Sequence, residues 1–82
     1  MHYRNGREAK NGDKVIQLDF AQAQVTAVGI LQDAVAGNDY CNGTILSTQT
    51  QQTLACLCDC IHADDLADLL KKAGLATRPP GK

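Results

Sequence analysis

The sequence predicts a mainly β (α+β) protein, a small antiparallel barrel or meander of about four or five strands with one C-terminal helix. Turn-forming residues recur at regular intervals, and alternating apolar segments lie between them. A leucine stripe at helical spacing follows near the end of the chain. The 82 residues suffice for one domain, which we expect at residues 1–76, followed by a flexible tail at residues 77–82.

The first fourteen residues are rich in turn signals and precede a strand. Asn-Gly pairs at residues 5–6 and 11–12 favour the positive φ angles of tight turns. Residues 15–20 then alternate apolar and polar side chains, which predicts a strand. The apolar side chains expected on one face of this strand are Ile16, Leu18 and Phe20.

Three further strands are expected, at residues 25–32, 40–48 and 53–62. Gly29 inside the first of these indicates a bulge or a sharp bend. The polar or turn-forming segments that separate the strands are residues 21–24, 36–39 and 49–52. This regular spacing is typical of an antiparallel meander or a small barrel.

A helix is expected at about residues 64–73. Asp64 is placed to cap its start, and Lys71 and Lys72 lie in its last turn, where the helix dipole favours positive charge. Gly74 suits the position after the helix, where a Schellman motif would follow. The apolar stripe comprises Leu66, Leu69, Leu70 and Ala73.

The charges are divided along the chain. The first fourteen residues carry +2, the last twelve carry +4, and the stretch from Val15 to Leu70 carries −7 without a single lysine or arginine. A phosphate backbone requires clustered cations, which the middle lacks, whereas an acidic stretch suits a basic partner protein. Asp64 and Asp65 belong to this stretch, and both also suit capping of the helix. The candidate partner-binding residues are Asp33, Asp39, Tyr40, Asp64 and Asp65.

Four cysteines allow three interpretations. The favoured one buries reduced thiols, with Leu54, Cys56, Cys58 and Cys60 on one inward face and Cys41 beside them on the neighbouring strand. The second is a zinc site, although its single-residue gaps differ from the usual C-x₂₋₄-C spacing. The third is a disulfide from Cys41 to Cys58 or Cys60. The candidate zinc ligands are Cys41, Cys56, Cys58, Cys60 and His62.

The sequence offers little that indicates catalysis. Cys60 and His62 could form a thiol–base pair oriented by Asp64 or Asp65, but the short chain shows no phosphate loop or nucleophile elbow. We therefore expect no enzyme activity. Neither a signal peptide nor an apolar run of about 20 residues is visible, so we expect a cytoplasmic protein with reduced thiols.

Four sequence blocks, at residues 3–10, 12–15, 37–43 and 60–65, resemble a group of short uncharacterised proteins of proteobacterial genomes, prophages and phages. The blocks contain the motifs NGREAK, GDKV, CNG and CIHADD. The resemblance implies a small SH3-like barrel and transfers no activity. It also implies that Cys41 and Cys60 belong to the shared pattern.

The leading functional hypothesis is a non-enzymatic binding module that contacts another protein through an acidic central surface, as an accessory or host-inhibitory factor of a phage would. One alternative is a zinc-stabilised structural domain. The other is nucleic-acid binding through the basic termini, for which few aromatic stacking residues exist. The basic residues that would then share one face are Arg4, Arg7, Lys10, Lys71, Lys72 and Arg78.

Overall fold

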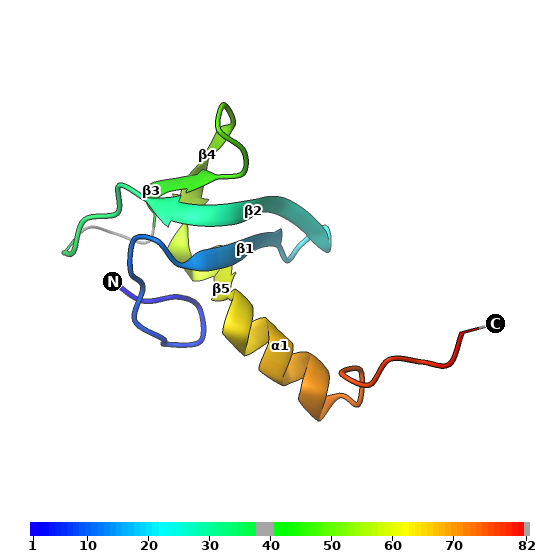
Figure 1. Ribbon diagram of the computed structural model, residues 1–82. Helices are drawn as coiled ribbons and strands as arrows, with labels where there is room; N and C mark the ends of the chain where they lie inside the picture. Colours follow the sequence, from blue (N-terminus) through cyan, green and yellow to red (C-terminus); the bar gives the residue numbers. More distant parts are fainter. Residues whose placement is uncertain (38–40, 82) are drawn as a thin grey trace.

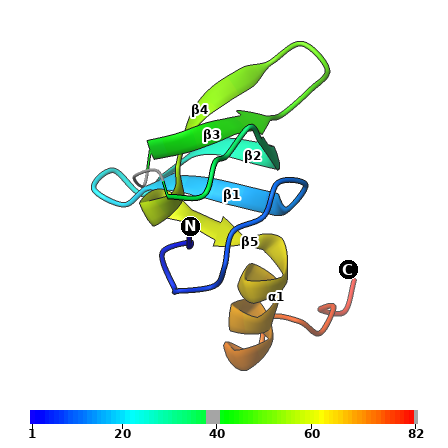
Figure 2. The same ribbon diagram turned by 90° about the vertical axis from the view of Figure 1, so that its left-hand side faces the viewer.

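In the part of the chain that the structure describes, five strands form one antiparallel sheet in the order β4-β3-β2-β1-β5, and one α-helix follows (Figures 1 and 2). This confirms a mainly β meander with one C-terminal helix. The computed structural model describes residues 1–37 and 41–81, with Cys41 described by its backbone alone. The elements are β1 (Lys14–Asp19), β2 (Gln24–Gln32), β3 (Cys41–Leu46), β4 (Gln52–Cys56), the 3-10 turn η1 (Leu57–Asp59), β5 (Cys60–His62) and α1 (Ala63–Lys72).

The first two strands begin one residue before their expected positions, and β3 lies within the predicted range. The continuous strand expected at residues 53–62 is wrong, because η1 interrupts it. The N–H of Cys60 closes this turn onto the carbonyl of Leu57. The interruption carries the chain from one edge of the sheet to the other, since β4 pairs with β3 and β5 pairs with β1.

The sheet curls without closing. No ladder joins β4 to β5 in the strand order, so the SH3-like barrel implied by the resemblance is not confirmed. Gln17 of β1 bonds to β4 across the inside of the curled sheet: its Oε1 accepts from the N–H of Cys56 at 2.6 Å, and its Nε2 lies 3.4 Å from the carbonyl of Leu54. A buried amide of β1 thereby takes the place of strand pairing along the inner side of β4.

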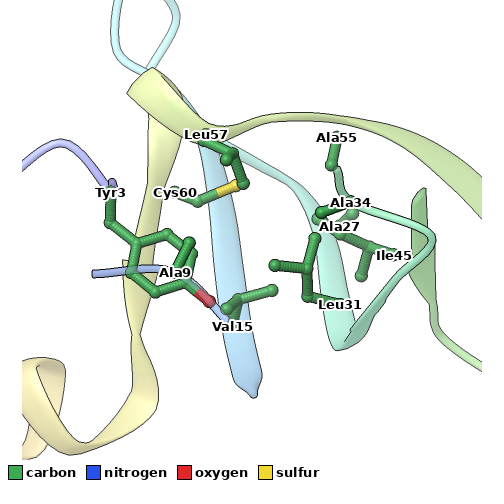
Figure 3. Close-up of a cluster of buried hydrophobic side chains, with 10 residues drawn as sticks. All are labelled: Tyr3, Ala9, Val15, Ala27, Leu31, Ala34, Ile45, Ala55, Leu57 and Cys60. Carbon is green, nitrogen blue, oxygen red and sulfur yellow. The ribbon is translucent and has the colours of Figure 1, made fainter. Parts of the chain in front are cut away.

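The core fills the concave side of the sheet (Figure 3). It receives side chains from all five strands, from η1 and from the N-terminal loop, and most of these side chains are small. Leu31 and Ile45 are fully buried at its centre. The members are Tyr3, Ala9, Val15, Ala27, Leu31, Ala34, Ile45, Ala55, Leu57 and Cys60.

The bulge expected at Gly29 lies elsewhere on β2. The register passes from Gln17↔Ala27 to Leu18↔Val25, which leaves Thr26 as the extra residue. Gly29 instead allows a close approach of two strands, because a Cβ at this position would overlap the carbonyl oxygen of Leu46 on β3. The absence of a side chain at Gly29 therefore serves the β2–β3 contact.

The helix starts one residue earlier than expected, and its cap differs from the prediction. His62, not Asp64, caps α1, because its Nδ1 accepts from the N–H of Asp64 at 3.0 Å. The C-terminal prediction is confirmed: Gly74 has a φ of 78°, and its N–H and that of Leu75 bond to the carbonyls of Lys71 and Leu70. These two bonds define a Schellman motif.

The helix does not cover the core. It leaves the sheet at the end of β5 and points away from it, so none of its residues is buried (Figure 1). The leucine stripe of α1 therefore adds no side chain to the core. The N-terminal loop, not α1, covers the core next to β5, and its Tyr3 and Ala9 are part of the core.

The N-terminal loop also shields the outer edge of the sheet. The N–H of Arg4 donates to the carbonyl of Cys60 on β5, and the N–H of Ala9 donates back to Met1, which holds the loop closed. Covering an edge strand in this way blocks pairing with other chains. Within residues 1–37 and 41–81, no helix is long and apolar enough to span a membrane.

Candidate interaction surface

The convex side of the sheet carries an apolar face that the chain leaves largely uncovered. Ile16 lies opposite both Val28 and Ile61, and Leu18 lies opposite Val25, so these side chains share one face. Phe20 continues the row just beyond β1. We call this set the outer apolar face: Ile16, Leu18, Phe20, Val25, Val28 and Ile61.

Three members of the outer apolar face are more than half exposed, at 51% for Phe20, 59% for Val25 and 54% for Val28. The sequence correctly places Ile16, Leu18 and Phe20 together. It does not reveal that their face is the convex one, because alternation gives the period of a strand without saying which side is buried. The core side of β1 is instead formed by Val15 and Gln17.

An apolar groove of about 260 Å³ lies where α1 meets the outer apolar face. The guanidinium of Arg4 stacks on Phe20, with Cζ 3.9 Å from the ring centroid, and so forms one wall. Leu69 of α1 lies on the opposite side and is 54% exposed. The groove is lined by Arg4, Asn5, Leu18, Phe20, Cys60, Ile61, Leu66 and Leu69.

Part of the acidic stretch is paired within the chain. Arg4 lies 3.6 Å from Asp59, and Arg7 binds Asp65 at 2.8 Å and lies 3.8 Å from Asp64. The hydrogen bond from Asn5, and then the hydrogen bond and the charge of Arg7, lower the pKa of the Asp65 carboxyl. The basic N-terminal segment thus folds onto the acidic middle, and fewer charges remain for a partner or for phosphate groups than the sequence suggests.

The predicted partner-binding residues occupy different places. Asp64 and Asp65 lie together in the first turn of α1, where Asp64 is exposed and Asp65 is held by Arg7 and Asn5. Asp33 is exposed after β2, with a positive φ of 59°. Asp39 and Tyr40 lie outside the described residues.

The predicted inward face of the cysteine run is wrong. Leu54 is 79% exposed and Ala55 is buried, so the inward face of β4 has the opposite parity to the one predicted, and η1 then buries Leu57. Among the three cysteines of the run only Cys60 is buried, and its Sγ lies 3.2 Å from the carbonyl of Cys56. Burial, followed by nearby Cys56, Asp59 and Cys58, raises the pKa of this thiol to about 12. Such a thiol is a poor nucleophile at neutral pH.

Neither predicted disulfide is present, since Cys58 and Cys60 are both reduced. Along the strands the backbone of Cys41 lies opposite Cys56 instead. In the part of the chain that the structure describes, no group of three or more histidine, cysteine or acidic side chains is arranged to hold a metal ion. The zinc hypothesis also includes Cys41, whose side chain lies outside that part, and it stays a prediction.

A polar network that the sequence does not reveal joins the N-terminal loop to β5. The hydroxyl of Tyr3 donates to Asp13 at 2.7 Å, and the other oxygen of Asp13 lies 3.6 Å from His62 Nε2. Tyr3 also meets the His62 ring edge to face. Both ring nitrogens of His62 thus face groups other than the Cys60 thiol. Among the described residues, no hydrogen bond joins His62 to Cys60. The only sequence signal was the turn-forming Asn11-Gly12, which precedes Asp13.

Ionisation of Asp13 within this network stabilises the folded chain. Burial opposes ionisation of Asp13, but hydrogen bonds from Tyr3 and from the N–H of Lys10, with the charges of His62 and Arg7, outweigh it and lower the pKa of Asp13. Burial, with the hydrogen bond to Asp13, raises the pKa of Tyr3. The network therefore acts as a structural clamp on the N-terminal loop.

Comparisons with protein-family models, with curated proteins and with solved structures gave no match. The resemblance to the short proteobacterial and phage proteins stays a prediction.

Proposed function

We propose that this chain is a non-enzymatic binding module that contacts another protein through the outer apolar face. The observation that carries the proposal is the exposure of Phe20, Val25 and Val28 on one side of a small sheet. Contiguous exposed apolar side chains, as opposed to scattered ones, mark interaction sites on soluble proteins. Aromatic and arginine side chains contribute most at such sites, and the stacked pair of Phe20 and Arg4 supplies both.

Charge at the rim of this face supports recognition of a partly basic partner. A cleft of about 540 Å³ adjoins Phe20 and carries Asp19 and Asp59 at its margin. Arg4 lies near Asp59, whereas Asp19 bonds to the backbone of the turn after β1. Complementary charges around an apolar centre speed the encounter of two proteins and select the partner. We expect the module to act in the cytoplasm, where Cys58 and Cys60 would stay reduced.

The outer apolar face can be tested by polar substitution of two exposed valines. The double variant Val25→Ser and Val28→Ser, immobilised and exposed to host lysate, should lose the proteins that the natural chain captures. Burial of one valine contributes about 1.5 kcal/mol, so each substitution should weaken binding about tenfold.

Val35→Ser is the matched control, because Val35 is 57% exposed but lies on the segment after β2, outside the outer apolar face. It should capture the same proteins as the natural chain. Equal capture by the double variant and the control would refute the proposed surface, and detection of zinc-dependent or nucleic-acid-dependent capture would favour one of the alternatives.

A further inference from the structure

The sequence contains three Asn-Gly pairs, at residues 5–6, 11–12 and 42–43. Asparagine before glycine is prone to spontaneous deamidation, because no side chain on the glycine hinders attack of its backbone nitrogen on the asparagine side-chain carbon. In a folded protein the reaction also depends on where the side-chain amide points and on how much structure must open to free it. The three pairs differ in both respects.

The amides of Asn11 and Asn42 are directed away from the glycines that follow them. Asn11 donates to the carbonyl of Ala34 and accepts from the Ala34 N–H, both at 2.9 Å. Asn42 forms the same pair of bonds with Val35, at 2.7 and 3.0 Å. The two asparagines thus hold adjacent residues of the segment after β2. Because Ala34 belongs to the core, freeing either amide requires a buried part of the chain to move.

The side chain of Asn5 has a different direction. Its Oδ1 accepts from the N–H of Arg7 at 3.2 Å, so the side chain curls over the intervening Gly6 peptide in an Asx turn. This turn brings Cγ of Asn5 towards the Gly6 nitrogen that would attack it. The other bond of the amide, from Nδ2 to Asp65 at 2.8 Å, lies at the surface, and both Asn5 and Gly6 are exposed.

The glycine nitrogens of the first two pairs are also held differently. The N–H of Gly6 donates to the carbonyl of Tyr3 at 3.0 Å, within one short turn. The N–H of Gly12 donates to the carbonyl of Leu31 at 2.8 Å, and Leu31 is fully buried on β2. A short exposed turn opens at a lower free energy than a contact with the core. Asn5 is therefore the asparagine with the easiest path to reaction.

We propose that Asn5 is a site of spontaneous deamidation, which loosens the N-terminal loop as the protein ages. The Gly6 nitrogen gives its proton to a solvent base and bonds to Cγ of Asn5. The Cγ–Nδ2 bond then breaks, and Nδ2 takes a proton from water and leaves as ammonia. A second water molecule opens the cyclic imide at either carbonyl, which gives aspartate or isoaspartate.

Each product weakens the contact between the N-terminal loop and α1. The new carboxylate replaces the amide that donates to Asp65 at 2.8 Å, so a hydrogen bond becomes a pair of facing negative charges. Isoaspartate also lengthens the backbone of the turn that the Tyr3 N–H closes onto the carbonyl of Arg7. Because this loop covers the core next to β5, its loosening exposes both the core and the edge of β5.

Deamidation rates at each site test the assignment. Digestion after Glu8 and after the lysines places the three asparagines in different peptides, and mass spectrometry detects the conversion of amide to carboxyl. In the folded natural chain Asn5 should convert first, and Asn11 and Asn42 at least about tenfold more slowly, because each must break two long-range bonds. Conversion should be faster at pH 8 than at pH 5, because the attacking nitrogen must lose its proton.

The unfolded chain is the matched control. In urea no fold protects any of the pairs, so the three asparagines should convert at similar rates. Asn5→Gln should stay unmodified at this position over the same period, because glutamine must form a larger ring. Equal rates at the three sites of the folded chain would overturn the assignment. So would a folded chain that leaves Asn5 intact while the unfolded chain converts.

The effect on the loop is tested by a variant that reproduces one product. Asn5→Asp should lower the melting temperature by about 5 °C, because it loses a hydrogen bond to a charged group and adds a repulsion. Adding Asp65→Asn should restore part of this loss, because the new amide can donate to the new carboxylate. Gln51→Glu adds the same charge at an exposed position before β4 and should leave the melting temperature unchanged. No decrease for Asn5→Asp, or no restoration by the second substitution, would refute the loosening.

Discussion

Gln17 is a buried amide in the core, and its four contacts link three strands. Its Oε1 accepts from the N–H of Cys56 and lies 3.6 Å from the thiol of Cys60, and its Nε2 lies within bonding distance of Thr26 and of the Leu54 carbonyl. Removing one partner of a buried hydrogen bond is more costly than the bond itself contributes, because the remaining group loses its solvation.

Gln17→Leu, which replaces the amide with an apolar side chain of similar size, should lower the free energy of unfolding by about 2–3 kcal/mol. Urea denaturation followed by circular dichroism measures this change. Gln24→Leu, at an exposed position of β2, should stay within about 0.5 kcal/mol of the natural chain. An unchanged midpoint for Gln17→Leu would mean that the amide does not hold β4 in place.

The lowered pKa of Asp13 predicts the direction of the acid response. A carboxyl whose pKa is lower in the folded chain than its ordinary value of 3.8 stabilises the fold above that value, and this stabilisation is lost as the pH falls further. Stability should therefore decrease below about pH 4. In Asp13→Asn the decrease should be shallower, although the variant is less stable at neutral pH.

Asp68→Asn, at an exposed position of α1, is the control for this experiment and should follow the natural chain at every pH. Thermal unfolding from pH 3 to pH 7 provides the comparison. Identical acid slopes for Asp13→Asn and the natural chain would exclude the Tyr3–Asp13 bond as a source of stability.

The thiol of Cys60 should react slowly in the folded chain. It is 1% exposed and its pKa is raised to about 12, so both access and ionisation oppose reaction. A variant that keeps only Cys60 should be labelled by a maleimide at pH 8 about a hundredfold more slowly than one that keeps only the half-buried Cys58. Equal rates without denaturant would contradict the burial of Cys60.

The close packing of β2 against β3 depends on Gly29 of β2. Gly29→Ala would drive a methyl group into the backbone of Leu46, which cannot move without shifting β3, so the variant should lose about 3 kcal/mol of stability. Gly81→Ala, in open space, should have no effect. Thermal unfolding distinguishes the two, and equal melting temperatures would show that β3 adjusts freely.

The sequence predicts elements best where the signal is local. Alternation locates β1 and β2 to within a residue of their start, and Gly74 with Leu75 predicts the end of α1 because a Schellman motif involves only neighbours. The break after Cys56 was missed, because the N–H that ends β4 binds the distant Gln17. The local sequence around Cys56 cannot predict a hydrogen bond to a residue 39 positions earlier.

The candidate surface was only partly predictable for a similar reason. The sequence groups Ile16, Leu18 and Phe20, but the identity of the buried face depends on Tyr3 and Ala9, which fold back from the N-terminal loop. The acidic stretch was visible as a charge run. The ion pairs of this stretch with Arg4 and Arg7 could not be predicted, because Asp59 and Asp65 lie more than 50 residues from these arginines along the chain.

The two ends of the chain contribute unequally to stability. Residues 75–81 are exposed and form no helix or strand, so deletion of residues 77–82 should change the melting temperature by less than about 2 °C. Deletion of residues 1–9 removes Tyr3 and Ala9 from the core, at a cost comparable to the stability of a small domain. That variant should be unfolded by circular dichroism, and a folded spectrum would contradict the clamp.

The backbone bond from Arg4 to Cys60 has a practical consequence for anyone who handles this protein. A bulky fusion partner joined ahead of Met1 would clash with the sheet and displace the N-terminal loop from β5. The uncovered edge of β5 would then be free to pair with a strand of another molecule, and the protein would aggregate on concentration. Affinity tags, dyes and surface tethers therefore belong at the carboxyl end.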